Sequence, residues 1–102
     1  MIREIGFVEV IEGREPEFEA AIKIAASTVL PRARGFQGFQ LHRGIERSNV
    51  YTFTLLWESL EDHTIGFRES SLFAEWRGIL GPFFANPPVI EHWTPLWEFP
   101  NS

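Results

Sequence analysis

Alternating and helix-periodic apolar residues divide the chain into predicted strands and helices. Residues Ile2–Ile11 alternate imperfectly and are rich in β-branched side chains, which is typical of a strand. Glu15-Pro16-Glu17 then opens a helix, because proline is tolerated in the first turn and acidic residues are favoured at the positive end of the helix dipole. The predicted buried stripe of this helix is Phe18, Ile22, Ala25 and Val29. Gly35 is the expected left-handed residue after its end.

Two strands of a hairpin follow, predicted at Phe36–Glu46 and Asn49–Glu58 around a loop at Arg47-Ser48-Asn49. A two-residue period separates each strand into two faces. The odd positions of the later strand form a strongly apolar face: Tyr51, Phe53, Leu55 and Trp57. The earlier strand carries Phe39 and Leu41 on one face and Gln40 and His42 on the other.

A pair of short helices is predicted between the hairpin and the last strand. Ser59-Leu60-Glu61-Asp62 resembles a capping box and starts the first of them. Its predicted inner stripe is Leu60, Thr64 and Phe67, with His63 and Arg68 flanking the stripe. Ser70-Ser71 offers an N-cap for the second helix, which Gly81-Pro82 ends. Its apolar positions are Leu72, Phe73, Trp76, Ile79 and Leu80.

The chain ends in a predicted strand at Val89–Thr94 and a tail at Pro95–Ser102. The resulting order, β-α-β-β-α-β with the second crossover split in two, is the ferredoxin-like arrangement. We therefore expect one α+β domain over residues 1–102, with a four-stranded antiparallel sheet and helices on one face.

The uncovered face of the sheet predicts a homodimer. We expect Ile2, Val8, Val10, Thr52, Thr54 and Leu56 on this face, which makes it too apolar for comfortable solvation. The tail adds Leu96, Trp97 and Phe99, which a monomer has little left to bury against. Pairing two sheets across a twofold axis, with residues 95–102 packed on the partner subunit, would cover both surfaces.

Composition removes several classes of function. The net charge is −5 and no stretch gathers Lys or Arg into a patch, so neither nucleic acid nor an anionic membrane is an expected partner. The absence of Cys removes disulfides, thiolate catalysis and zinc–thiolate sites. The start lacks a signal-peptide pattern, and no apolar run reaches the ~18–20 residues that span a bilayer, which predicts a soluble, cytoplasmic protein.

Several segments of the chain resemble the antibiotic biosynthesis monooxygenase-like domains. They are Leu56–Thr64, Phe67–Ser70, Phe73–Arg77 and Gly81–Trp93, and the similarity extends over nearly the whole chain. The resemblance implies a ferredoxin-like fold that pairs into a dimeric α+β barrel. It also implies the oxidation of phenolic polyketides to quinones by O2 without metal or flavin.

The same resemblance sorts the branches of the family. Trp57 matches a Trp that lines the cavity in both the quinone-forming and the haem-degrading branches. The haem-degrading branch also needs an Asn on the first strand and an axial His on the last helix. Here these regions read Ile5-Gly6-Phe7 and Phe73–Arg77, with neither residue. We expect no haem, no metal and no other cofactor, since the chain also lacks metal-ligand spacing and a phosphate-binding loop.

A cofactor-free oxygenase needs an aromatic cavity, a base with a pKa near neutrality and a cation facing the developing charge. His63 is the expected catalytic base, with a pKa near neutrality; alternatively it bonds Glu61 or Asp62. Arg68 is the expected anion holder; alternatively it pairs with Glu61 or Glu69.

Other residues have both a substrate-binding and a structural interpretation. The expected aromatic walls are Trp57, Phe67, Phe73 and Trp76, which could equally be plain core. His92 could bind substrate, or form a hydrogen bond at a strand edge or dimer seam. His42 is expected at the surface or the dimer seam, and Arg77 is expected to pair with Glu75 or extend outward.

These residues predict a cofactor-independent monooxygenase that acts on a small aromatic or polyketide-like molecule. An isomerase or cyclase on the same scaffold would use the same base without O2. A non-catalytic small-ligand-binding or stress-associated protein would need neither His63 nor Arg68 for affinity.

Overall fold

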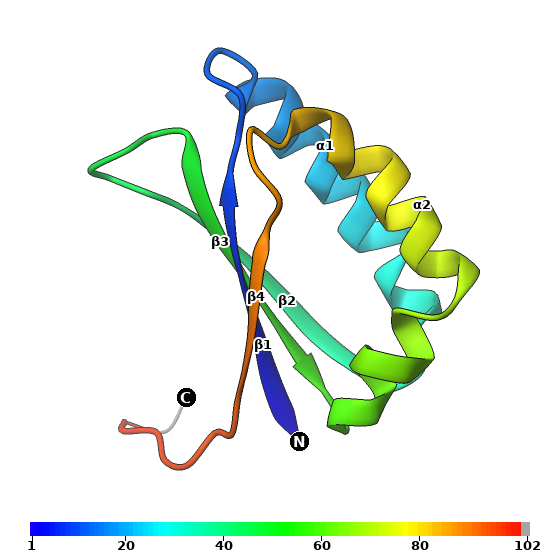
Figure 1. Cartoon of the computed structure of the whole chain (residues 1–102). Coiled ribbons are helices and arrows are strands. Elements are labelled where there is room, and N and C mark those ends of the chain that lie inside the picture. Colours follow the sequence, from blue (N-terminus) through cyan, green and yellow to red (C-terminus); the bar gives the residue numbers. More distant parts are fainter. Residues whose placement is uncertain (101–102) are drawn as a thin grey trace.

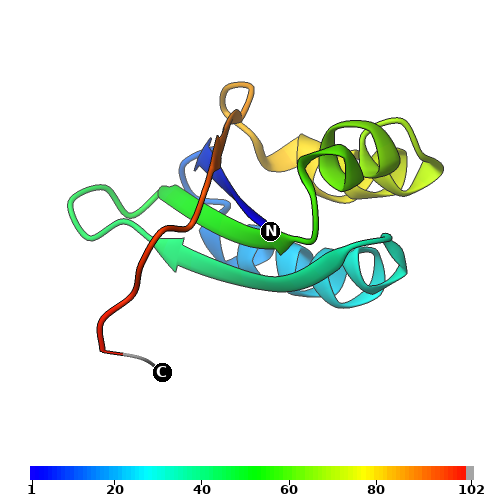
Figure 2. The ribbon, with the colours of Figure 1, turned by 90° about the horizontal axis from the view of Figure 1, so that it is seen from below.

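The computed structural model describes residues 1–100 as two layers, a sheet and a set of helices that covers one of its faces (Figure 1, Figure 2). The strands are β1 (Ile2–Glu9), β2 (Phe36–Arg43), β3 (Val50–Trp57) and β4 (Val89–Trp93). The helices are α1 (Glu15–Thr28) and α2 (Ser71–Leu80), with short helices η1 (Leu30–Arg32), η2 (Asp62–Phe67) and η3 (Gly81–Phe83). All neighbouring strands are antiparallel in the order β2-β3-β1-β4. This confirms the predicted ferredoxin-like α+β fold, including the split second crossover.

The helices follow the predicted signals closely. Helix α1 has Pro16 in its first turn and buries the predicted stripe, including Val29 just past its end. Ser70 caps α2, because its Oγ accepts a hydrogen bond from the Leu72 N–H at 3.2 Å. Gly35 follows η1 with φ 82°, the left-handed conformation that favours glycine. Among residues 1–100, no helix is long and apolar enough to cross a membrane.

Strand ends differ from the prediction by one to three residues. Strand β2 ends at Arg43 rather than Glu46, so the hairpin loop is longer than expected. It is closed by the Gly44 N–H, which donates to the Val50 carbonyl at 2.7 Å. At the same end of the sheet, β1 stops at Glu9 opposite Val50, and Val10 forms only an isolated bridge with Phe84.

The core lies between the sheet and the helices. The odd positions of β3 are all buried, as predicted from their apolar pattern. They meet the stripe of α1, where the rings of Phe18 and Tyr51 lie 4.9 Å apart. Phe39 and Leu41 of β2 also pack against this core, which confirms the predicted faces of that strand.

Strand β1 buries the opposite face to the one predicted. Val8 and Val10 are buried in the core and Ile2 packs against it, so these three residues do not lie on the uncovered face. The register explains the difference, since Val8 lies opposite Tyr51 and directly opposed residues share a face. Alternation alone does not say which side a strand buries.

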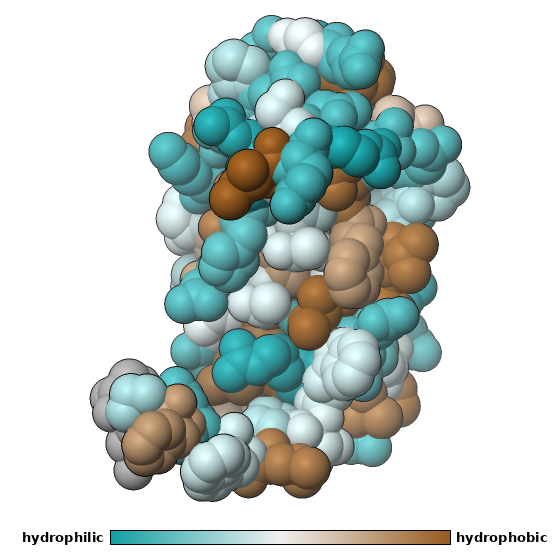
Figure 3. All heavy atoms as spheres, turned by 90° about the vertical axis from the view of Figure 1, so that its left-hand side faces the viewer, coloured by the Kyte–Doolittle hydropathy of each residue, from teal (hydrophilic) through white to brown (hydrophobic). Residues whose placement is uncertain are grey.

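The uncovered face of the sheet mixes apolar and polar side chains (Figure 3). Thr52, Thr54 and Leu56 lie on it as predicted, opposite Phe7, Ile5 and Arg3 of β1 respectively. The edge strand β4 adds the exposed side chains of Val89 and Trp93.

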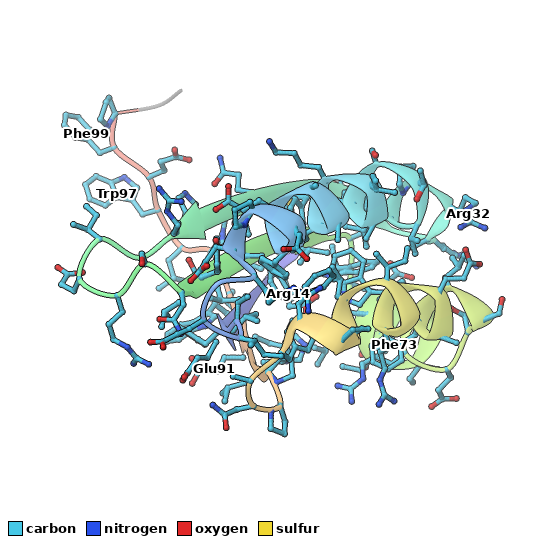
Figure 4. All side chains as sticks on the ribbon, turned by 90° about the horizontal axis from the view of Figure 1, so that it is seen from above. Arg14, Arg32, Phe73, Glu91, Trp97 and Phe99 are labelled. Carbon is cyan, nitrogen blue, oxygen red and sulfur yellow. The ribbon has the colours of Figure 1, made fainter. Side chains whose placement is uncertain are left out.

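The tail after β4 extends away from both long helices. Figure 4 shows Trp97 and Phe99 beyond the end of the sheet, and their stacked rings lie 6.0 Å apart. Trp97 is 84% exposed, and Leu96 and Phe99 are similarly bare. The tail therefore buries little against its own subunit, as the sequence predicts. The end of the predicted domain and tail, residues 101–102, lies outside the described residues.

Candidate active site

A cavity of about 550 Å³ lies between the sheet and the helices η2 and α2. Its aromatic walls come from Phe53 of β3, Phe67 of η2, and Phe73 and Trp76 of α2. The loop 85–88 forms a further wall ahead of β4. A volume of this size falls in the range of small-molecule sites, which is ~300–1,000 Å³.

Glycine 6 of β1 makes room for one of these walls. A Cβ on Gly6 would collide with the ring of Phe53, which lies over the glycine from the neighbouring strand. The ring of Phe53 packs in turn against Trp76 at 6.1 Å. The missing side chain therefore lets the aromatic wall approach the sheet closely.

A hydrogen-bonded chain of three polar side chains reaches the cavity at its buried end. Glu4 Oε1 lies 3.2 Å from His63 Nε2, and His63 Nδ1 lies 2.8 Å from His92 Nε2. Glu4 also accepts a hydrogen bond from Trp57 Nε1 at 2.9 Å. Glu4 is 4% and His63 3% exposed, whereas His92 is exposed on the edge strand. The chain therefore runs from the cavity, which Glu4 and His63 line, to the surface.

The sheet register places Glu4 and His92 together. They lie directly opposite each other on β1 and β4, so both side chains project from the same face. Glu4 is also opposite Leu55 of β3, a core residue, and this identifies the face as the one that the helices cover.

Helix η2 turns His63 inward because it is a π-helix rather than the predicted α-helix. The Arg68 N–H donates to the His63 carbonyl at 3.0 Å, the five-residue spacing of a π-turn. His63 and Phe67 become the buried positions, while Leu60 is 39% exposed. The predicted inner stripe of Leu60, Thr64 and Phe67 is thus wrong apart from Phe67, because it assumed α-helical spacing. The predicted cap is present, since Ser59 Oγ accepts from the Asp62 N–H at 3.2 Å.

Aromatic rings surround the His63 imidazole. Its ring stacks on Trp57 at 5.3 Å and lies 6.2 Å from Phe67. Trp57 is completely buried and does not line the cavity, so its contribution is the hydrogen bond to Glu4 and the stacking on His63. Phe67, Phe73 and Trp76 do line the cavity, and Phe67 and Trp76 are also part of the buried core.

Burial shifts the titration of both members of the buried pair. It raises the pKa of Glu4 to about 7, against the hydrogen bond from Trp57 and the charge of Arg68, which both lower it. Burial also lowers the pKa of His63 to about 4, and the nearby charges of His92 and Arg68 act in the same direction. The contact between Glu4 and His63 is therefore a hydrogen bond between a carboxyl that titrates near neutral pH and a neutral imidazole.

These values correct the expectation for His63. The sequence predicts a pKa near neutrality, from apolar neighbours balanced by Glu61 or Asp62. The structure instead gives His63 the partners Glu4 and His92. The group with a pKa near neutrality is Glu4, which sequence reasoning missed. Its only sequence signal is an acidic residue among apolar ones inside a predicted strand.

Two guanidinium groups face the cavity from the helical side. Arg68 and Arg77 lie 5.4 and 5.8 Å from the ring centroid of Phe73. Phe73 is a wall residue of the cavity on α2 (Figure 4). Glu75 pairs with Arg32 at 2.6 Å rather than with Arg77, and Arg77 is exposed, so of its two expected placements the outward one agrees with the structure. Within residues 1–100, Arg68 takes part in no ion pair, and Glu61 and Glu69 are not its partners.

The donor set of the hydrogen-bonded chain does not converge on one point. Glu4 and His92 contact different nitrogens of the His63 ring, and each donor atom is already engaged by its neighbour. Among residues 1–100, no three His, Cys, Asp or Glu side chains are grouped to hold a metal ion. His42 lies on the uncovered face of the sheet, opposite Thr52 and away from this site.

Comparison with known proteins gives consistent matches. The family model described as antibiotic biosynthesis monooxygenase matches residues 1–78, which include Glu4 and His63 but not His92. The uncharacterized protein YczJ of Bacillus subtilis (strain 168) is 38% identical over 92 residues, 90% of this chain and 96% of its own.

Solved structures agree with this match. A Bordetella bronchiseptica protein, assigned as an antibiotic biosynthesis monooxygenase, is 41% identical with a TM-score of 0.90, over 94% of this chain and 97% of its own. SnoaB, a cofactor-independent oxygenase from Streptomyces nogalater, is 18% identical with a TM-score of 0.81, over 98% of this chain and 97% of its own. The second likeness concerns the fold alone.

Proposed function

Because the chain belongs to the antibiotic biosynthesis monooxygenase family, we propose that it is a cofactor-independent oxygenase that converts a small aromatic, polyketide-like phenol to a quinone. Family membership supports a general monooxygenase-like function. The substrate class and the independence from a cofactor are our inferences from the site. An acidic substituent on the ring would suit the two guanidinium groups at the cavity.

The observation that carries the proposal is one cavity with three kinds of group. Aromatic side chains supply flat walls for a ring, Arg68 supplies a cation, and Glu4 supplies a carboxyl with a pKa of about 7. A proton acceptor with a pKa near the working pH is the most effective general base at that pH. Arg68 is exposed, and its attraction to a phenolate would strengthen as the bound ring excludes water from the cavity.

The first step is removal of the phenolic proton. The base is the hydrogen-bonded pair of Glu4 and His63, in which the carboxylate takes the proton and the imidazole holds the carboxylate in place. Arg68 stabilises the phenolate that forms, and the walls Phe67, Phe73 and Trp76 position its ring. Deprotonation is needed because the phenolate, unlike the neutral phenol, is electron-rich enough to pass electrons to O2.

The oxygen chemistry then balances without an external reductant. O2 joins a ring carbon of the phenolate to form a peroxide. The O–O bond breaks as the ring C–H proton passes to the outer oxygen, so a carbonyl forms and the second oxygen departs as hydroxide. This hydroxide becomes water with the proton that the base took from the phenol. For 1-naphthol, the products are 1,4-naphthoquinone and one water per O2.

The test is oxygen consumption by the purified protein with 1-naphthol and hydroxynaphthoic acids, with and without a metal chelator. We expect one O2 per quinone formed, unchanged by the chelator and without added flavin. Turnover that continues under strictly anaerobic conditions would favour an isomerase or cyclase instead. Binding of these compounds without any O2 consumption would favour a ligand-binding protein.

We also propose that the chain is a homodimer that closes into an α+β barrel through its uncovered sheet faces and tails. Support comes from the exposed Val89 and Trp93 on β4 and from the bare rings of Trp97 and Phe99. Obligate interfaces bury on the order of 2,000 Å² or more. Light scattering that gives a monomer at micromolar concentration would contradict this.

A further inference from the structure

His92 has no role in the function proposed above, yet it is hydrogen-bonded to His63 of the buried pair. It does not line the cavity, and its Nε2 lies 2.8 Å from His63 Nδ1. We propose that Glu4, His63 and His92 form a proton relay that carries the proton taken from the substrate out of the cavity to solvent at strand β4. The proposal rests on the proposed function only for the source of that proton.

A relay is needed because the carboxyl that takes the proton is buried. Glu4 is 4% exposed, and a bound aromatic ring would fill the cavity on its open side. Each turnover leaves a proton on this carboxyl when the hydroxide departs to solvent. The next turnover requires that proton to follow, so that the two form the product water outside the cavity. The hydrogen-bonded path to the surface runs through His63 to His92, which is exposed because β4 is an edge strand of the sheet.

An imidazole can pass a proton without becoming charged, since it binds one nitrogen's proton while releasing the other's. In the loaded state, Glu4 donates to His63 Nε2 and His63 Nδ1 donates to His92 Nε2. The carboxyl proton then moves to His63 Nε2, the Nδ1 proton moves to His92 Nε2, and the proton on His92 Nδ1 leaves to water. One proton leaves for each one taken up, which leaves Glu4 ionised and both imidazoles protonated on Nε2. The rings then turn to return their protons to the starting positions before the next transfer.

The surrounding charges suit a relay through neutral imidazoles. Arg68 follows η2 and lowers the pKa of His63 and of His92, after the larger effect of burial on both. Arg77 faces the cavity from α2, and Trp57 of β3 contributes a neutral donor to Glu4. Arg68 opposes a positively charged imidazole, so the proton crosses the three groups without resting on either histidine.

The variant that tests the relay is His92→Gln. The amide oxygen of Gln can take the place of His92 Nε2 and accept the hydrogen bond from His63 Nδ1, but an amide does not shuttle protons. His42→Gln is the matched control, because His42 is an exposed histidine on β2 that faces away from the cavity.

The first measurement needs no turnover. The exchange of the His63 imidazole N–H with water is followed by ¹⁵N-resolved NMR. We expect His92→Gln to slow this exchange on the order of 10-fold or more, as for loss of a positioned proton-transfer group. His42→Gln should leave it unchanged. Exchange at the wild-type rate in His92→Gln would overturn the relay, whether or not the protein is active.

The second measurement is the steady-state rate of the phenol oxidation in dilute buffer. His92→Gln should lower kcat on the order of 10–100-fold with KM unchanged, and added imidazole should restore kcat in proportion to its concentration. Wild-type kcat in His92→Gln, or a loss that imidazole does not restore, would overturn the relay. A wild-type protein without O2 consumption would contradict the proposed function instead, and the exchange rate alone would then decide the relay.

Discussion

Two hydrogen-bonded polar clusters lie on the same face of the sheet, and only one borders the cavity. In the distant cluster, Tyr51 donates to Glu19 Oε2 at 2.6 Å, and Arg43 Nη1 lies 3.2 Å from the same oxygen. In the cavity cluster, Glu4 contacts His63, which contacts His92. Both clusters satisfy a buried polar side chain. Their protons behave differently.

The difference lies in which group is buried. In the distant cluster, the carboxylate of Glu19 is partly exposed and paired with an exposed Arg43, and burial raises the pKa of Tyr51 to about 12. That proton stays on the phenol at every physiological pH. In the cavity cluster the carboxyl itself is buried, and its pKa of about 7 allows the proton to come and go. A buried hydrogen bond is therefore a site of chemistry only where the proton is mobile and a cavity adjoins it.

Removal of the exchangeable proton of Glu4 should have the largest effect. Glu4→Gln keeps an acceptor for Trp57 but has no proton-binding oxygen, so we expect phenol oxidation to fall on the order of 100-fold or more. Tyr51→Phe removes a buried hydroxyl of the distant cluster and should leave kcat unchanged. Initial rates at pH 7 measure both, with circular dichroism as a check on folding. Equal losses in the two variants would mean that the clusters do not differ in function.

The elements that the sequence predicts are those whose apolar residues repeat with a regular period. The stripe of α1 and the odd face of β3 repeat over several turns or pairs, so each position supports the others. Glu4 is not predictable in the same way. The alternation of β1 is interrupted by Glu4 and Gly6 on its inward face, so it does not reveal which side is buried. Which side of β1 is buried depends on its register with β3 and β4, and the sequence of one strand does not specify that register.

The sequence identifies His63 as a candidate site residue, but it does not reveal which way the side chain points. Its pattern fits an α-helix, in which it would flank the buried stripe. The π-turn of η2 adds one residue between hydrogen-bonded groups and rotates His63 inward. Its partners come from β1 and β4, which are distant in sequence. The sequence thus predicts the chemistry of His63, and the tertiary contacts determine its pKa.

A smaller effect is expected on the pH dependence of folding stability. Glu4 has a folded pKa of about 7 above its ordinary 4.5, so its contribution to stability is present below pH 4.5 and is lost as pH rises to 7. His63 has a folded pKa of about 4 below its ordinary 6.5, so its contribution is present above pH 6.5 and is lost as pH falls to 4. The two trends oppose each other between pH 4.5 and 6.5.

Variants should separate the two trends. Relative to wild type, the unfolding free energy of Glu4→Gln should rise with pH between 4.5 and 7. That of His63→Gln should fall as pH rises from 4 to 6.5. Each slope is at most about 1.4 kcal/mol per pH unit. Urea unfolding across this pH range measures both differences, and two flat lines would show that neither group has a shifted pKa.

The most direct test of the site is an NMR titration of the two buried groups in the wild-type protein. Carboxyl ¹³C shifts follow Glu4, and imidazole ¹⁵N shifts follow His63. We predict that Glu4 titrates with a midpoint near 7 and that His63 stays neutral, with one protonated nitrogen, down to about pH 4. A Glu4 midpoint near 4.5 together with a His63 midpoint near 6.5 would contradict the account. Both groups would then keep their ordinary pKa values, and the cavity would lack a carboxyl that exchanges its proton near neutral pH.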